Sequence, residues 1–168
     1  MANSCVELDN RSLTMSEIMP PHAANFSGHV HGGHLMLLLD RVAYACAARY
    51  AGHYAVTLSV DQVLFKQPIM VGELVTFYAS VNYVGRSSME IGIKVVAENL
   101  TTRKSRHTNT SYFTMVAVNE QGKPVAVPPL KMRNQLDRYR FHEAELRKAH
   151  RMQVQETHRS HKAQVRSI

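Results

Sequence analysis

A long apolar run between glycine-marked ends constrains the fold of this chain more than any other feature. Gly32 and Gly33 mark a turn at its start, and Gly52, a residue type that often ends helices, follows it. The run has no proline and no interior glycine, and its apolar residues cover almost the whole helical wheel. We therefore predict a helix that is buried on nearly every side. The run is too short, and too often interrupted by charged residues, to span a membrane.

Asp40 is the exception in this predicted helix. It lies two turns in, too late to cap the helix start, among Met36, Leu37, Ala43 and Tyr44. Burying an ionised carboxylate without a partner costs several kcal/mol, so the side chain needs hydrogen-bond donors or a chemical role. The residue alone leaves two interpretations open, a carboxylate paired inside the protein or with a neighbouring chain, and a catalytic acid.

The chain of 168 residues has a formal net charge of +7, and most of that charge lies near its C-terminus. From Lys131 onward there are ten Lys and Arg residues against four Asp and Glu residues. The preceding residues, with ten basic against nine acidic side chains, are nearly neutral. A neutral body makes nucleic acid an unfavoured partner, although a binding module that acts through the basic tail stays open as an alternative.

The two cysteines, Cys5 and Cys46, have no metal-like spacing between them. Their number fits a reducing compartment, and Cys46 is expected to pack as a small apolar residue inside the helix. The N-terminus shows no basic stretch followed by an apolar run, so no signal peptide is visible. These features predict a cytoplasmic location.

After Gly52 the residue pattern changes from helical to alternating. Residues 54–65, 74–84, 88–98 and 106–118 are rich in β-branched and aromatic residues and are predicted to be strands, with a turn at Gly85 and Arg86. Residues 12–19 are expected to form a further short strand. The pattern predicts an α+β fold in which the helix packs on one face of a curved antiparallel sheet. Because one helix cannot easily cover so many strands, we also predict an obligate dimer.

Several ordered blocks in this pattern resemble the hotdog-fold acyl-CoA thioesterases, the cytosolic acyl-CoA hydrolase group that includes the YciA-type enzymes. Each block is weak alone, but their order is specific, and together they span roughly residues 13 to 130. The blocks are Met19-Pro20, Asn25-Phe26-Ser27-Gly28, Gly32-Gly33, Asp40, Val56-Thr57, Phe65-Lys66-Gln67-Pro68-Ile69, Val84-Gly85-Arg86-Ser87-Ser88-Met89-Glu90 and Tyr112-Phe113-Thr114-Met115-Val116-Ala117-Val118.

The resemblance implies a hotdog fold and hydrolysis of fatty acyl-CoA to free acid and CoA, with CoA as part of the substrate and no cofactor. It implies a dimer in which two helices lie together over a continuous sheet, and often a hexamer built from three dimers. We assign residues 1–130 to the hydrolase domain. Residues 131–168 form a basic tail outside the resemblance, with a solvated helix and a partly disordered segment as equal alternatives.

The resemblance also implies that Asn25 and Asp40 are the catalytic polar pair, contributed to one site by opposite subunits. Asp40 would act as a general base on water or attack the thioester directly, and the sequence does not separate these roles. Asn25 would hold the water or polarise the carbonyl. The alternative interpretation is that Asn25 is a turn residue whose side chain caps the local backbone.

Gly32 and Gly33 precede the helix, where backbone N–H groups point outward and the helix dipole favours negative charge. These amides are candidate donors to the oxyanion that forms during thioester hydrolysis. A plain glycine-rich turn is the alternative interpretation.

The turn at Arg86, Ser87 and Ser88 offers a guanidinium, two hydroxyls and backbone amides, and the resemblance implies that it binds the phosphates of CoA. Ordinary turn composition is the alternative. A short charged run follows, made of Arg103, Lys104 and Arg106. These residues either assist the turn in binding the phosphates or belong to an ordinary solvated loop.

His29, His31 and His34 depart from the commonest pattern of the family, which has an aromatic residue where His31 stands. Three histidines over six residues suggest metal binding, but they lack a second ligand cluster, so we expect no metal. His31 is instead a candidate to bind substrate or to tune Asp40.

A hotdog hydratase acting on enoyl-CoA is the second enzymatic alternative. Such an enzyme would have a histidine five residues after the aspartate, and the fifth residue after Asp40 is Ala45. The sequence therefore favours the thioesterase.

Overall fold

The computed structural model of this protein describes residues 9–61 and 63–165. These residues form five strands, two α-helices and one short 3₁₀ helix. In chain order these are β1 (Ser12–Ile18), η1 (Pro21–Ala23), α1 (Gly32–Ala51), β2 (Tyr54–Val60), β3 (Leu74–Val84), β4 (Ser88–Asn99), β5 (Lys104–Val118) and α2 (Gln135–Val165).

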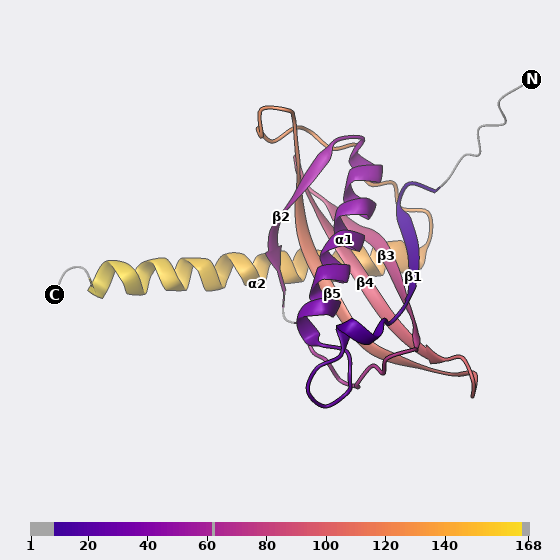
Figure 1. The fold of residues 1–168 in the computed structure, drawn as a ribbon. Coiled ribbons are helices and arrows are strands. Elements are labelled where there is room, and N and C mark those ends of the chain that lie inside the picture. The colour runs from indigo at the N-terminus through magenta and orange to yellow at the C-terminus, as the bar shows by residue number, and fades with distance from the viewer. Residues whose placement is uncertain (1–8, 62, 166–168) are drawn as a thin grey trace, which may run out of the picture. The chain divides into compact units, whose positions relative to one another are not determined.

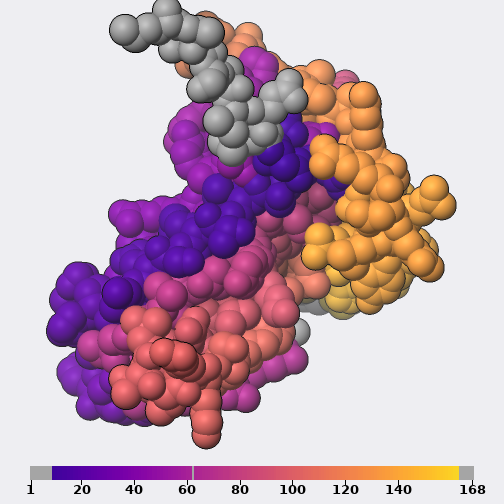
Figure 2. Space-filling model, turned by 90° about the vertical axis from the view of Figure 1, so that its right-hand side faces the viewer, coloured from indigo at the N-terminus to yellow at the C-terminus, as the bar shows by residue number. Residues whose placement is uncertain are grey.

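All five strands belong to one antiparallel sheet with the order β1-β3-β4-β5-β2. The long helix α1 lies across one face of this sheet and packs against every strand (Figure 1). At one edge the indigo segment that holds β1 runs beside the magenta segment that holds β3 (Figure 2). The other edge is β2, which pairs only with β5. A long helix wrapped by an antiparallel sheet is the hotdog fold, so the predicted α+β architecture is confirmed.

Helix α1 begins and ends where its sequence indicates. Gly52 follows the last helical residue with φ of 67°, a left-handed conformation that glycine adopts without a steric penalty, and its N–H bonds to the carbonyl of Ala48. The buried face of α1 packs on sheet residues such as Phe77, Ile93 and Phe113, which have no exposed surface. This apolar layer is the core of the domain.

The prediction that α1 is buried on nearly every side is wrong for a single chain. Leu37 and Tyr44 are 49% and 38% exposed, and Asp40 lies on the same open face. The apolar composition of the helix therefore reflects two faces, one packed on the sheet of its own chain and one left open. Asp40 is accordingly an exposed carboxylate in the protomer, and not the buried one that its apolar neighbours indicated.

The strand predicted over residues 54–65 ends earlier than expected, at Val60. The N–H of Asp61 still bonds to Tyr112 and that of Lys66 to Thr108, so residues on both sides of position 62 stay attached to β5. The described residues from 63 to 69 have no regular ladder and instead bring Phe65 against Gly32. Position 62 lies outside the described residues. Strand β3 agrees with its prediction residue for residue, and β5 begins at Lys104, two residues before the expected position.

The chain divides into two compact units, Met1–Pro129 and Leu130–Ile168. The second unit contains α2, which covers residues 135–165. Compactness does not assign a function to either unit, so the assignment of hydrolase activity to residues 1–130 stays a prediction. Neither described helix is long and apolar enough to cross a membrane.

Candidate active site

Asp40 is held by a residue of the neighbouring strand. The hydroxyl of Thr57, in β2, donates a hydrogen bond of 2.6 Å to Oδ1 of Asp40, in the middle of α1. Thr57 also lies 3.4 Å from the sulfur of Met115. The carboxylate thus has one oxygen positioned by a hydroxyl, while its side chain stays exposed on the open face of α1. Such an arrangement orients a carboxylate without removing it from water.

Asn25 organises the turn that leads into α1. Its Oδ1 accepts hydrogen bonds from the backbone N–H groups of Ser27, at 2.9 Å, and His29, at 3.1 Å. Its own N–H bonds to the carbonyl of His29 at 2.6 Å. The local capping that we considered as an alternative therefore occurs, and it uses the amide oxygen. Among the contacts of the described residues, none uses Nδ2 of Asn25 and none joins Asn25 to Asp40 within one chain.

The start of α1 is capped by a histidine. Nδ1 of His31 accepts the N–H of Gly33 at 2.9 Å, and the carbonyl of His31 accepts from His34 and Leu35. The N–H of Leu35 makes the first regular helical bond, and the other two bonds satisfy two of the donors, those of Gly33 and His34, that a helix start leaves open. The N–H of Gly32 has no acceptor among the described residues. Of the two glycines expected to bind an oxyanion, Gly33 is thus already engaged within its own chain.

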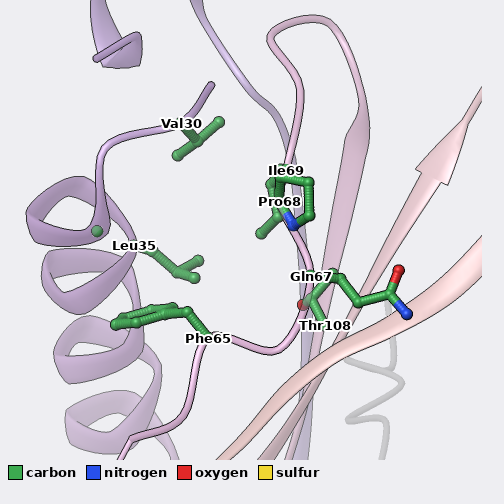
Figure 3. A pocket seen from close by; sticks show the side chains of 8 residues that line it. Val30, Leu35, Phe65, Gln67, Pro68, Ile69 and Thr108 are labelled. Atoms are coloured by element: carbon green, nitrogen blue, oxygen red, sulfur yellow. The ribbon is translucent and has the colours of Figure 1, made fainter. Parts of the chain in front are cut away.

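A pocket of about 210 Å³ adjoins this helix start. Figure 3 shows Leu35 pointing from α1 toward Phe65, while Pro68 and Ile69 form another wall and Gln67 points away from the helix. The ring of Phe65 lies 3.8 Å from where a Cβ on Gly32 would stand, an ordinary van der Waals distance, so Phe65 packs close to the backbone of Gly32. The pocket is lined by Val30, Gly32, Leu35, Phe65, Gln67, Pro68, Ile69 and Thr108.

Arg106 supports the pocket wall from the outside. Its guanidinium makes two hydrogen bonds of 2.7 Å to Glu73 and one of 2.6 Å to the carbonyl of Pro68. Glu73, whose side chain is 5% exposed, also accepts the N–H of Met70. The hydrogen bonds from Arg106 lower the pKa of Glu73, and those to Glu73 raise the pKa of Arg106. Arg106 is therefore committed to the 68–73 loop and is not part of a solvated charged run.

Arg86 and Ser87 lie in the turn between β3 and β4, as expected, and Ser88 is the first residue of β4. The backbone carbonyls of Arg86 and Ser87 accept from Val127 and Ala117, and Arg86 is exposed. The strand register places this turn beside the end of β5, because Ser88 pairs with Val116. Thr108, in the pocket, lies near the other end of β5. Within one chain the predicted CoA-binding turn and the pocket are therefore at opposite ends of the sheet.

The three histidines have separate surroundings. His31 caps α1, the N–H of His29 binds Asn25, and the ring of His34 packs edge-on against His22 at 5.9 Å between centroids. No group of three or more His, Cys, Asp or Glu side chains within residues 9–61 and 63–165 is arranged to hold a metal ion.

Sequence reasoning missed the roles of Thr57 and of the pocket residues. Thr57 belongs to one of the sequence segments that resemble the family. The residues next to it along the chain gave no sign of a contact with Asp40, 17 positions earlier. Alternation of side chains along the predicted strand could have placed it on one face, although not opposite a particular turn of the helix.

Residues 27–104 match the thioesterase superfamily. The protein VdlD of Helicobacter pylori is 51% identical to this chain over 140 residues, which cover 83% of this chain and 80% of VdlD. An acyl-CoA hydrolase of Staphylococcus aureus, solved with butyryl coenzyme A, coenzyme A and coenzyme A disulfide, is 31% identical, with a TM-score of 0.77 over 87% of this chain and 92% of that one. The chain belongs to the thioesterase superfamily.

Two further sets of solved structures bear on the site and on assembly. A hexameric acyl-CoA thioesterase in its apo form is 31% identical, with a TM-score of 0.82 over 85% of this chain and 92% of that one. The S. aureus hydrolase was also solved as variants with alanine in place of an asparagine, an aspartate and a threonine, with TM-scores of 0.78, 0.76 and 0.75 and identities of 29%, 30% and 29%.

Proposed function

We propose that this protein hydrolyses acyl-CoA thioesters to free acid and CoA. The contact between Asp40 and Thr57 carries the proposal. In the S. aureus hydrolase the replaced asparagine, aspartate and threonine are separated by 15 and 17 positions, and the same intervals separate Asn25, Asp40 and Thr57 here. Two of these three residues are in direct contact in this structure.

In the proposed reaction the C–S bond breaks, the acyl carbon gains the hydroxyl of water, and the CoA thiolate takes up a proton. Asp40 is the carboxylate that removes the proton from water or that attacks the acyl carbon. The hydroxyl of Thr57 keeps one carboxylate oxygen occupied. The other oxygen is the candidate to act on water or on the acyl carbon.

The amides near the start of α1 provide the donors for the oxyanion in this proposal. The N–H of Gly32 is the better candidate of the two glycine amides, because that of Gly33 is accepted by His31. Nδ2 of Asn25 is the second candidate, since the turn uses only Oδ1 of that side chain. A donor aimed at a developing oxyanion is typically worth about 10²–10³ in rate.

A second copy of the chain completes the site in this proposal. Strand β2 is an edge strand, and four of its apolar residues are from 39% to 68% exposed, namely Tyr54, Val56, Leu58 and Val60. Leu37 and Tyr44 continue this apolar surface onto α1. An exposed apolar edge strand favours pairing with another strand. Antiparallel pairing of two β2 strands would bring Asp40 of one subunit toward Asn25 of the other.

The same pairing accounts for the position of the predicted CoA-binding turn. A two-fold axis through β2 reverses the direction of the second sheet, so Arg86, Ser87 and Ser88 of one subunit come to the end that holds the pocket of the other. We infer that this turn binds the CoA phosphates across the dimer. The hexameric relative supports a further assembly of three such dimers.

We infer a cytoplasmic location, supported by the free thiol of Cys46.

Measuring thiol release from butyryl-, octanoyl- and palmitoyl-CoA tests the proposed activity. We expect turnover by the wild type and a loss of at least about a hundredfold in kcat/KM for Asp40→Asn, the scale for loss of a general base. Glu120→Gln, the same chemical change at an exposed turn residue, is the matched control and is expected to leave the rate unchanged. Equal rates for Asp40→Asn and the wild type would contradict the site assignment.

A further inference from the structure

The pocket beside Gly32 has a buried floor and an exposed rim. Three of its lining residues are each at most 4% exposed, and we call them the pocket floor: Leu35, Ile69 and Thr108. Phe65, which is 50% exposed, also lines the pocket and stands at its rim. A group that enters from the solvent therefore passes Phe65 first and meets the pocket floor last.

The lining suits an alkyl chain better than a polar one. Its two polar side chains are directed elsewhere. The hydroxyl of Thr108 lies 3.3 Å from the carbonyl of Val95 and from Oδ1 of Asn109, and Gln67 points away from α1 (Figure 3). The pantetheine arm of CoA carries amide groups, and their burial without partners costs free energy. The lining therefore favours the acyl chain over the pantetheine arm as its occupant.

The position of Gly32 links the pocket to the proposed chemistry. Its N–H has no acceptor among residues 9–61 and 63–165 and is the proposed oxyanion donor. Gly32 also lines the pocket, so a thioester carbonyl bound to this N–H places the acyl carbon at the pocket. The rest of the chain then extends between Leu35 and Phe65, as Figure 3 shows Leu35 pointing toward that ring.

Hydrogen bonds hold the wall opposite α1 in place. The N–H of Val30, in the turn before α1, bonds to the carbonyl of Ile69 at 2.8 Å. The guanidinium of Arg106 binds the carbonyl of Pro68 at 2.6 Å and is fixed in turn by Glu73. A long acyl chain would have to break these bonds to push the wall aside, which costs free energy. The size of the pocket is therefore a real limit on its occupant.

We propose that Leu35, Ile69 and Thr108 limit this enzyme to acyl chains of about eight carbon atoms or fewer. This inference rests on the proposed thioesterase activity. A pocket of about 210 Å³ holds about seven methylene-sized groups at roughly 30 Å³ each, the share of a water molecule in the liquid. The carbonyl carbon at Gly32 adds one more. A longer chain leaves its end in water or overpacks the floor, and either loses transition-state stabilisation.

The dependence of kcat/KM on chain length tests the proposal. Thiol release is measured for the even-numbered acyl-CoAs from acetyl- to palmitoyl-CoA. We expect the wild type to reach its maximum at about eight carbon atoms or fewer, and kcat/KM for palmitoyl-CoA to be at least about tenfold below that maximum. Leu35→Ala removes part of the pocket floor, so its maximum should move to a chain about two carbon atoms longer.

Val42→Ala is the matched control. Val42 is fully buried about two turns further along the same face of α1 and does not line the pocket. This variant should keep the wild-type maximum, even where the rates fall for all chain lengths alike. Ile69→Val is a smaller change in the pocket floor and serves if Leu35→Ala does not fold. It should raise kcat/KM for the first chain beyond the wild-type maximum, relative to the chain at the maximum.

The possible outcomes separate this inference from the proposed function. A wild-type kcat/KM that stays level up to palmitoyl-CoA, or a maximum that both floor variants leave unchanged, overturns the chain-length limit alone. A rise in KM of equal size for every chain length in Leu35→Ala would assign the pocket to the pantetheine arm and overturns the limit as well. Absence of thiol release from every acyl-CoA overturns the proposed function and this inference together.

Discussion

The hydroxyl of Thr57 reaches Oδ1 of Asp40 at 2.6 Å and joins the middle of β2 to the middle of α1. This contact lies on the face of the protomer that carries its exposed apolar residues. The carboxylate is therefore oriented by its own chain and is open to a second one. The arrangement explains why an acid can stand in an apolar helix without an internal ion pair.

Loss of the Thr57 hydroxyl should slow the chemical step more than it weakens substrate binding. We expect Thr57→Val to reduce kcat by about ten- to a hundredfold with little change in KM, because the valine leaves the carboxylate unoriented. Thr57→Ser should restore most of the activity. Steady-state thiol release measures both parameters, with Thr101→Val, an exposed loop variant, as control. A normal kcat in Thr57→Val would show that the contact is only structural.

Disrupting the β2 edge should abolish both assembly and activity. Leu58 is 68% exposed in the protomer, and Leu58→Lys would bury an unpaired charge in the proposed dimer. Sedimentation should give a smaller species for this variant, while Leu100→Lys, at a site 48% exposed in a loop, should sediment as the wild type.

Mixing subunits tests the shared site directly. Refolding equal amounts of Asn25→Ala and Asp40→Asn should recover about a quarter of the wild-type activity, since half of the dimers then hold one intact site of two. No recovery in a mixture that does form mixed dimers would contradict the pairing of Asn25 and Asp40 across subunits.

The ion pair between Arg106 and Glu73 should make stability depend on acid pH. The pKa of Glu73 is lower in the folded chain than its usual value, first because Arg106 donates to it. Its contribution is therefore present above the usual glutamate pKa of about 4.5 and is lost as the pH falls through the lower folded value. Urea unfolding at neutral pH should show Glu73→Gln less stable by about 1–3 kcal/mol, and this difference should shrink toward pH 3. A difference that does not change with pH would contradict this role.

Cys46 should be inert toward thiol reagents in the folded protein. Burial raises the pKa of its thiol to about 12, and the residue has no exposed surface. In a Cys5→Ser background, dithionitrobenzoate at pH 8 should react only when urea unfolds the chain. Rapid reaction of the folded protein would show that α1 opens locally.

Features set by neighbouring residues were predictable from the sequence. The glycines around the helix and the turn at Gly85 act through their own backbone, so the ends of α1 and the β3–β4 hairpin were placed within a few residues. Asn25 similarly caps its own turn, as its residue type suggests. The strand after Gly52 was overestimated, because residues 61 and 63–65 have strand composition and still lie outside the regular ladder.

The sequence by itself determined a long helix followed by antiparallel strands, because hydrophobic periodicity and turn residues act over a few positions. Only the tertiary structure decided that Asp40 is exposed and held by Thr57, that Phe65 faces Gly32, and that Arg106 holds Glu73. These contacts join residues 17 to 33 positions apart, and no local pattern encodes which of them meet. They follow from the strand order and from the place where α1 crosses the sheet, which arise when the whole core packs.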